Sequence, residues 1–199
     1  MKKRSERVHD GLAEYQREHT LAMKKSFLKL GDRVEEVGNV LVGALKSRHK
    51  VLIFGNGGSA TQASHFAGEL MGRFSKTPRL PLAAVALASD PGIVTCIGND
   101  FGYDALFERQ IEALARPGDV ALALTTSGRS ENVLRGLAAA RRKRATTVAL
   151  TGEAGLAGAK PDYLLDVSSG STSYIQEVHI IFLHLWCVRI DKAFRSRPS

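Results

Sequence analysis

The strongest constraint on the fold is an alternation, from residue 48 onward, of short apolar runs, glycine-containing turns and amphipathic stretches. The apolar runs predict strands at 51–54, 82–87, 120–124, 147–150 and 163–167. The amphipathic stretches predict helices at 61–74, 91–97, 104–114, 130–143 and 175–194. Strands that alternate with helices are typical of an α/β fold, in which helices cover a mostly parallel sheet. We therefore expect a three-layer α/β domain with a central five-stranded sheet flanked by helices.

The segment before residue 48 has a different pattern, with apolar side chains often three or four residues apart from Leu12 to Leu45. This spacing predicts helix. Gly31 and Asp32 predict a break, with Asp32 as the N-cap of a second helix. These two helices are expected to cover the domain or to pack against another subunit. With no linker or repeat, we expect one domain over 1–199, made of a helical segment (1–47), an α/β core (48–194) and a frayed tail (195–199).

Composition excludes several classes of protein. Hydrophobic residues make up 44% and charged residues 24%, and no apolar stretch approaches the roughly 20 residues that span a bilayer. The basic residues at 2–4 are not followed by the apolar region of a signal peptide. Two cysteines, Cys96 and Cys187, are too few for a disulfide framework. We expect a cytoplasmic protein with reduced thiols and no membrane partner.

The net charge of +8 is compatible with a nucleic-acid partner or with an anionic small molecule. Basic residues cluster at 2–4, 141–144 and 195–197. No nucleic-acid motif and little aromatic interleaving accompany them. A solvated basic surface is therefore the favoured interpretation, and nucleic acid is not the expected partner.

The glycine-rich loop at 55–60 leaves a predicted strand and enters a predicted helix. At such a junction, exposed backbone N–H groups and the helix dipole favour an anion, and glycines let it approach closely. The loop also resembles the G-x-G-x-x-A fingerprint of dinucleotide sites, which needs an acidic residue about 20 positions further on. Glu69 lies within the predicted helix and Asp90 is too distant, so dinucleotide binding is disfavoured. An anion site and a plain strand-to-helix turn remain open.

A second loop, at 125–130, also joins a predicted strand to a predicted helix. It supplies four hydroxyl groups within six positions, from Thr125, Thr126, Ser127 and Ser130. A purely structural explanation is an N-cap at Ser130 with further hydroxyls in the turn. Few turns need so many hydroxyls, and beside a helix N-terminus they could surround a phosphoryl group. The Lys of a P-loop is missing, so the loop predicts phosphate binding rather than phosphate transfer.

Titratable side chains that could act beside these loops occur on two predicted helices. His65 and Glu69 are four residues apart, and Gln176 and His184 are eight apart, so each pair lies on roughly one helix face. Spacing alone favours a simpler interpretation, in which His65 and Glu69 form an ordinary helical pair and His184 is a satisfied core residue.

Two further features leave the assignment open. His179 competes with His184 for any catalytic role, because helical spacing does not choose between them. Asn99 and Asp100 follow a predicted helix and are expected in a loop.

Five strings of residues, in order along nearly the whole chain, resemble the phosphoheptose isomerases. They lie at 55–59 (Gly-Asn-Gly-Gly-Ser), 65–70 (His-Phe-Ala-Gly-Glu-Leu), 98–102 (Gly-Asn-Asp-Phe-Gly), 125–128 (Thr-Thr-Ser-Gly) and 175–179 (Ile-Gln-Glu-Val-His). That family has the sugar isomerase (SIS) fold, a parallel sheet between helices, and forms tetramers whose sites use more than one subunit. The resemblance implies conversion of sedoheptulose 7-phosphate to D-glycero-D-manno-heptose 7-phosphate by a homotetramer with N-terminal helices at a subunit interface.

The resemblance also implies roles for individual residues. Glu69 matches the family's catalytic glutamate and His184 its catalytic histidine, which act as base and acid in a proton transfer through an enediol. The matching substrate contacts are Asn56, Gly57, Gly58, Ser59, Glu69, Asn99, Asp100, Thr125, Thr126, Ser127, Ser130 and Gln176. Some members bind zinc, and the matching ligands are His65, Glu69, Gln176 and His184. Zinc could polarise the carbonyl, although a metal-bound glutamate is a poorer base and Gln is an uncommon ligand.

Departures from the family pattern concern the rim of the implied site. Gly68 stands where many isomerases have a second Glu, and Arg129 stands where Asn is common. Ser173 and Tyr174 replace a pair that often contains Arg. These differences leave open another phosphosugar or another heptose configuration.

Two non-catalytic SIS proteins are alternatives to an enzyme. One is an adaptor like the relative that binds the bacterial replication initiator DnaA, and the other is a regulator that senses a phosphosugar. The DnaA-binding relative does not keep the catalytic Glu and His, whereas this chain has Glu69 and His184. An enzyme is therefore expected, with a phosphorylated sugar as its substrate.

Overall fold

The computed structural model describes residues 2–76 and 78–195, with side chains from residue 11 onward. Its elements, in chain order, are α1 (Lys2–Lys46), β1 (Val51–Gly55), α2 (Gly58–Met71), β2 (Ala84–Ala86), α3 (Pro91–Phe101), the 3-10 helix η1 (Tyr103–Ala105), α4 (Leu106–Leu114), β3 (Val120–Leu124), α5 (Glu131–Arg142), β4 (Thr146–Thr151), β5 (Tyr163–Asp166) and α6 (Thr172–Phe194). The predicted frayed tail lies, apart from Arg195, outside the described residues.

The five strands form one sheet in the order β2, β1, β3, β4, β5, and every pairing among them is parallel. The predicted five-stranded parallel sheet is thereby confirmed. β1 and β3 are neighbours, with Val51 opposite Val120 and Gly55 opposite Leu124. Their carboxyl ends therefore meet at one edge of the sheet, which is where ligands bind in open α/β folds.

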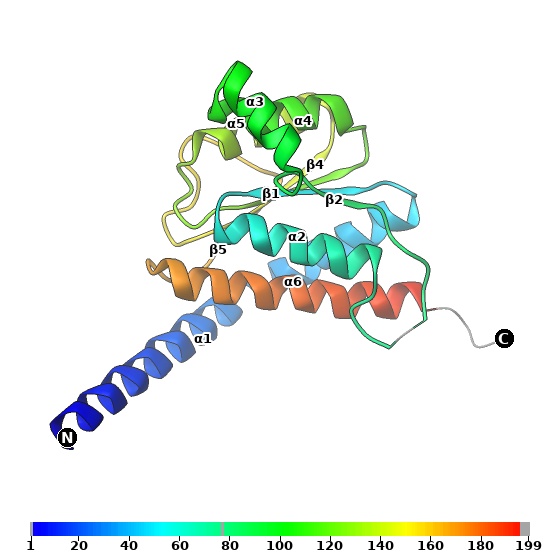
Figure 1. Ribbon diagram of the computed structural model, residues 1–199. Coiled ribbons are helices and arrows are strands. Elements are labelled where there is room, and N and C mark those ends of the chain that lie inside the picture. The colour runs from blue at the N-terminus through cyan, green and yellow to red at the C-terminus, as the bar shows by residue number, and fades with distance from the viewer. Residues whose placement is uncertain (1, 77, 196–199) are drawn as a thin grey trace.

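Helices cover both faces of this sheet, so the predicted three-layer arrangement is confirmed (Figure 1). Helices α1, α2 and α6 pack on one face, and α3, α4 and α5 pack on the other. Each face has its own apolar core, because Ile53 and Leu122 belong to the first cluster while Leu52 and Ala121 belong to the second. Burial on both faces explains why these strands read as continuous apolar runs in the sequence.

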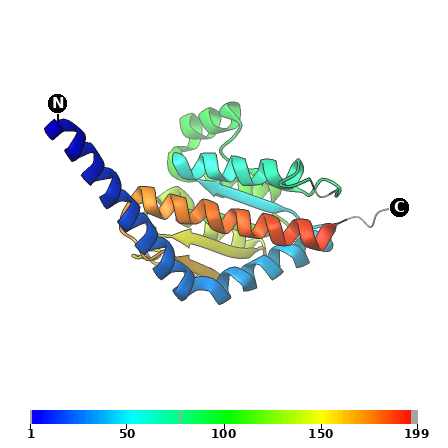
Figure 2. The same ribbon diagram turned by 90° about the horizontal axis from the view of Figure 1, so that it is seen from below.

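The predicted break at Gly31 and Asp32 is wrong, because α1 is a single helix of 45 residues. Its buried side chains continue on both sides of Gly31, from Leu30 to Val34 and Val37. Burial of this stripe against the sheet and α6 outweighs the roughly 1 kcal/mol that a glycine costs inside a helix. Figure 2 shows that α1 bends along its length and that its N-terminal part extends beyond the body of the molecule.

Asn99 and Asp100 lie in the last turn of α3, so the prediction of a loop at these residues is wrong. The helix begins at an efficient cap, where the Asp90 carboxylate accepts hydrogen bonds from the N–H groups of Gly92 and Ile93. It continues to Phe101 and ends at Gly102, whose φ of 82° a side chain would disfavour.

The other boundaries shift by a few residues. α2 starts at Gly58 rather than 61, because the glycine loop turns directly into the helix, and it ends at Met71 rather than 74. β2 is reduced to Ala84–Ala86 at the edge of the sheet. None of the helices within residues 2–76 and 78–195 combines the length and the apolar character that a membrane span needs.

Candidate active site

A cavity of about 200 Å³ opens at the carboxyl edge of the sheet, between the ends of β1 and β3. It is lined by Asn56, Ser59, Leu124, Thr125, Thr126, Ser127, Ser130, Thr172 and Gln176. The lining includes or adjoins the first residues of α2, α5 and α6, so three helix N-termini converge on one small polar space. Each N-terminus contributes a partial positive charge and free N–H groups, which makes this cavity suited to a phosphate.

The loop after β1 is shaped by its glycines. Gly57 has a φ of 55°, and Gly58 leaves room for Gln176, whose amide nitrogen would lie 2.6 Å from any Cβ at this position. The Ser59 N–H and the Ala60 N–H donate to the Asn56 and Gly57 carbonyls as α2 begins. Asn56, Ser59 and Gln176, which the family resemblance implies as substrate contacts, line the cavity, whereas Gly57 and Gly58 shape the loop beside it.

The hydroxyls of the loop after β3 have two roles, because some accept hydrogen bonds within the turn and others are available to a ligand in the cavity. Thr125 accepts a hydrogen bond from the Gly128 N–H and Ser127 accepts one from the Arg129 N–H, so these two stabilise the turn. Ser130 takes the N-cap position of α5, but its side chain makes no capping hydrogen bond to the described residues. Ser130 and Thr126 both line the cavity, and their hydroxyls have the capacity to donate to an anion.

Three residues of the site region were missed by sequence reasoning. Asn56 and Asn132 exchange two side-chain hydrogen bonds of 2.9 and 3.0 Å, and the Tyr103 hydroxyl donates to the Asn56 side-chain oxygen at 2.9 Å. This network fixes the side chain at the start of the glycine loop. Thr172 lines the cavity from the first turn of α6. A polar residue in the first turn of a helix beside a phosphate loop is the only signal that could have indicated Asn132 and Thr172.

Glu69, His65 and His184 form a second polar group, between α2 and α6. These two helices lie side by side on the same face of the sheet (Figures 1 and 2). The Nε2 atoms of His65 and His184 are 2.9 Å apart, and His65 Nε2 is 3.7 Å from a Glu69 carboxylate oxygen. The structure therefore brings together the two predicted proton carriers, which are far apart in the sequence. Since Glu69 is partly buried and His65 half-exposed, the group remains open to a ligand.

His184, not His179, faces this group. His179 is completely buried and its Nε2 lies 3.2 Å from the Thr151 carbonyl of β4. Burial lowers the pKa of His179 to about 4, against a smaller opposing effect of the Thr151 hydrogen bond. His179 is thus a neutral core residue, and the packing of α6 places His184 rather than His179 beside His65.

The four predicted zinc ligands are not gathered in one cluster. Within the described ranges, no group of three or more His, Cys, Asp or Glu side chains is arranged to hold a metal ion as it stands. Gln176 packs against Gly58, eight residues or about 12 Å along α6 from His184. The chemistry of the remaining donors nevertheless fits zinc, because two imidazole nitrogens and a carboxylate are its usual ligands in catalytic sites. The Nε2 atoms of His65 and His184 face each other, and only one of them can carry the proton that lies between them. A metal ion could replace that proton.

Two further predicted substrate contacts lie elsewhere. Asn99 and Asp100 are exposed on α3 and neither lines the cavity. The Asn99 amide donates to Asp100 at 2.7 Å, and the Cys96 thiol lies 3.7 Å from the other Asp100 oxygen. Within one chain, these residues are not brought to the phosphate loops.

Comparison with known proteins identifies the family. The profile of the SIS domain matches residues 14–152. A phosphoheptose isomerase of Aquifex aeolicus is 48% identical over 177 residues, which are 88% of this chain and 92% of the relative. The chain belongs to the SIS domain phosphoheptose isomerases. The family resemblance predicted from the ordered motifs is thereby confirmed.

Solved structures of this family have the same fold. The phosphoheptose isomerase of Francisella tularensis matches with a TM-score of 0.88 and 33% identity, covering 93% of this chain and 98% of that one. The phosphoheptose isomerase of Neisseria gonorrhoeae matches with a TM-score of 0.83 and 36% identity, covering 93% and 99%. The SIS family fold therefore extends over nearly the whole chain, including the helices that carry Glu69 and His184.

Proposed function

We propose that this sugar-phosphate isomerase converts sedoheptulose 7-phosphate to D-glycero-D-manno-heptose 7-phosphate, with Glu69 and His184 as the proton carriers. The observation that carries the proposal is the meeting of Glu69, His65 and His184 across two helices that also border a phosphate-sized cavity. Membership of the family supplies the reaction class, and the named relatives supply the heptose. What we propose is therefore the identity of the substrate and the roles of Glu69 and His184.

The phosphate is held by the cavity at the carboxyl edge of the sheet. Hydroxyls of Ser130 and Thr126 and the N–H groups at the start of α2, α5 and α6 donate to its oxygens. These contacts are made equally in the ground state and in the transition state. They therefore tether and orient the open-chain sugar and do not themselves carry out the proton transfer.

Isomerisation requires a proton to move between neighbouring carbons. The Glu69 carboxylate removes a proton from C1 of the ketose, while His184 gives a proton to the C2 oxygen, so that the C1–C2 enediol forms. Glu69, now protonated, returns the proton to C2, and His184 recovers a proton from the C1 hydroxyl, which leaves the aldehyde at C1. The net change is a 1,2-shift of two hydrogens with no external reactant. In the absence of a metal ion, the contact between the Nε2 atoms of His65 and His184 orients the His184 ring.

Zinc is proposed as the cofactor. His65, Glu69 and His184 would hold it, with Gln176 as the fourth predicted ligand. When bound, zinc would polarise the substrate carbonyl and stabilise the negative charge of the enediolate.

A homotetramer in the cytoplasm is proposed as the functional form. Along α6, the phosphate cavity at Gln176 and the proton carriers at His184 are about 12 Å apart, so a cavity of one copy and the carriers of a neighbouring copy could share one substrate. Exposed apolar side chains on α1 support an interface, and they are Leu12, Tyr15, Leu21, Phe27 and Leu28. Light scattering on the purified protein should give the mass of four chains, and an active monomer would contradict this part of the proposal.

The deciding experiment is to incubate the protein with sedoheptulose 7-phosphate, with and without Zn²⁺, and to follow aldose formation by NMR. Turnover that requires Glu69 supports the proposal. The matched control is Glu112→Gln, which removes an exposed carboxylate on α4, on the opposite face of the sheet. Absence of turnover by an intact oligomer, with and without zinc, would refute the heptose assignment.

A further inference from the structure

A buried ion pair lies at the end of α2, away from the phosphate cavity. The Arg79 Nε and the Asp191 Oδ1 are 2.6 Å apart, and their side chains are only 1% and 6% exposed. Burial acts to raise the pKa of Asp191, but hydrogen bonds from Arg79 and Ser75 outweigh it and hold this pKa below its usual value. The Asp191 carboxylate is therefore charged, and it forms a buried ion pair with the Arg79 guanidinium.

The same guanidinium also binds the last turn of α2. Its Nη2 donates to the Glu69 carbonyl at 2.6 Å, and its Nη1 donates to the Leu70 carbonyl at 2.9 Å. These carbonyls are at the negative end of the helix dipole, where a cation is favoured. Arg79 thus joins the residue that carries the proposed base to Asp191 of α6, seven positions or about two turns after His184.

The connection between α2 and β2 completes this link. It leaves α2, passes the C-terminal half of α6 and returns to the sheet (Figure 1). Ser75 donates from its N–H and its hydroxyl to Asp191 Oδ2, at 3.1 and 2.7 Å. The neighbouring Phe74 ring packs on the His184 ring, with 5.4 Å between their centroids. Asp191 therefore holds the residue next to Phe74, whose ring packs against His184.

We propose that Arg79 and Asp191 are positioning residues that set the separation and orientation of Glu69 and His184 for proton transfer. The proposal rests on the function proposed above. Arg79 acts on Glu69 through the backbone of α2, and Asp191 acts on His184 through Phe74 and the α6 axis. Neither residue touches the substrate cavity.

Stability alone is a poor explanation for this pair. Two charges taken out of water gain little net free energy, and a well-packed apolar pair of similar volume is often as stable or more stable. A guanidinium that donates to four fixed acceptors, however, specifies direction and distance in a way that apolar packing does not. Proton transfer depends on such precision, since a misplacement of about 1 Å can cost about 10²-fold in rate.

The test is the double variant Arg79→Met/Asp191→Leu, which replaces the ion pair by apolar side chains and keeps the interior filled. We expect a folded protein with an unchanged KM for sedoheptulose 7-phosphate and a kcat lowered by about 10²-fold. The single variant Arg79→Lys keeps the charge but not the fork of donors, and it should recover only part of the loss.

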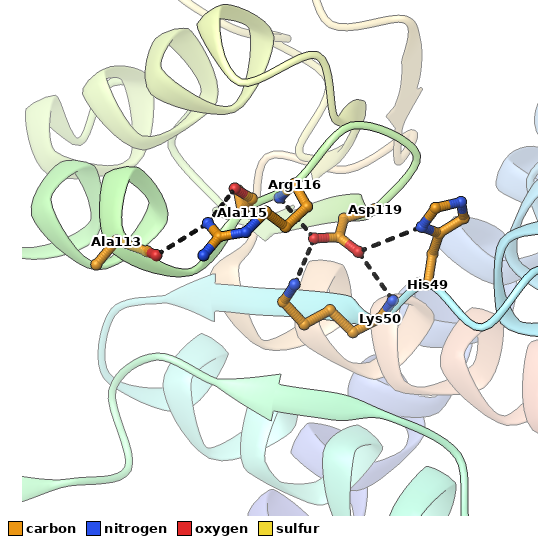
Figure 3. Close-up of polar contacts among 6 residues, drawn as sticks. All are labelled: His49, Lys50, Ala113, Ala115, Arg116 and Asp119. Carbon is orange, nitrogen blue, oxygen red and sulfur yellow. Dashed lines mark hydrogen bonds and ion pairs between the residues drawn. The ribbon is translucent and has the colours of Figure 1, made fainter.

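The matched control is a second buried carboxylate, that of Asp119, which directly precedes β3 and belongs to a different group of polar contacts (Figure 3). Asp119 is 2% exposed and accepts hydrogen bonds from the N–H groups of Lys50 and Arg116 and from the Lys50 ammonium at 2.6 Å. His49 Nδ1 lies 3.9 Å from the same carboxylate. Asp119→Asn should lower stability and leave kcat unchanged at temperatures below its unfolding transition.

Wild-type kcat in the double variant, or an equal loss of kcat in Asp119→Asn, would overturn the positioning role. A readout independent of turnover separates this outcome from failure of the proposed function. The imidazole ¹⁵N signals of His184 report its Nε2 contact with His65, and they should change in the double variant as they do in His65→Gln. If the wild-type protein does not turn over the heptose, these signals still test the positioning role of Arg79 and Asp191. Unchanged signals in the double variant would refute that role.

Discussion

His179 should make the stability of the protein depend on pH in a way that one substitution removes. The side chain is completely buried on α6, and burial lowers its pKa to about 4 from an ordinary value of 6.5. As pH falls below 6.5, the unfolded chain binds a proton at this residue while the folded chain does not. Protonation therefore favours the unfolded state, and stability that is present above pH 6.5 is lost as pH falls toward 4.

The size of the effect follows from the difference between the two pKa values. A difference of about 2.5 units at 1.36 kcal/mol each corresponds to about 3 kcal/mol over the whole range. Between pH 7 and pH 5 the same linkage gives a loss of about 2 kcal/mol in the free energy of unfolding. Glu108, Asp119 and Asp191 have lowered pKa values, so they lose their contributions at lower pH, below the usual range of carboxyl groups.

Urea unfolding followed by tryptophan fluorescence measures this loss. Trp186 is the only tryptophan, and it is buried with its indole N–H donating to the Val34 carbonyl. The wild type and His179→Gln are compared at pH 7 and pH 5 at one protein concentration, because subunit association also contributes to stability. We expect the variant to lose about 2 kcal/mol less than the wild type between these pH values. Equal losses in the two proteins would refute the reasoning.

Three further predictions concern the site and the phosphate loop. Glu69→Gln and His184→Ala should each lower kcat by about 10²-fold or more with the fold retained, and near-normal turnover of either variant would show that the chemistry lies elsewhere. Ser130→Ala should raise KM about tenfold or more with little change in kcat or stability, since it removes one donor to the phosphate. An unchanged affinity for the substrate in isothermal titration calorimetry would contradict this role of Ser130. Gly128→Ala should destabilise the protein severely, because its Cβ would lie 1.7 Å from a backbone oxygen at a φ of 65°. In contrast, Gly158→Ala has a similar φ of 73° and open space, so it should cost only about 1–2 kcal/mol; equal melting temperatures of the two variants would contradict this.

The sheet could be predicted from the sequence because its strands are buried on both faces and read as apolar runs between glycine-containing turns. The break at Gly31 could not be judged in the same way. The glycine lowers local helix propensity by about 1 kcal/mol, which is too little to break α1. Leu30, Val34 and Val37 are buried together, and α6, about 150 residues later in the sequence, packs beside them. The helical position of Asn99 was missed for a related reason, since the cap at Asp90 sets where α3 starts but only Gly102 sets where it ends.

The candidate site could be predicted only in part. The hydroxyls after β3 stand out in the sequence because four of them occur close together before a helix. Helical spacing did not separate His184 from His179, and only the family resemblance favoured His184. The rotation of α6 against α2 and β4, which spacing does not contain, places His184 beside His65. Arg79 and Asp191 had no sequence signal at all, because they are 112 residues apart and a lone charge in a connection is usually solvated.

The pairing of α2 with α6 also bears on how the protein matures during synthesis. His65 and His184 are separated by 119 residues, and α6 follows all the other elements of the described residues. At about 5–20 residues per second, a ribosome needs roughly ten seconds to make that interval. During this time the glycine loop and the sheet can form, but α1 has no α6 to cover its apolar stripe. The proposed proton carriers therefore cannot meet, and the nascent chain is most in need of a chaperone, until α6 leaves the ribosome.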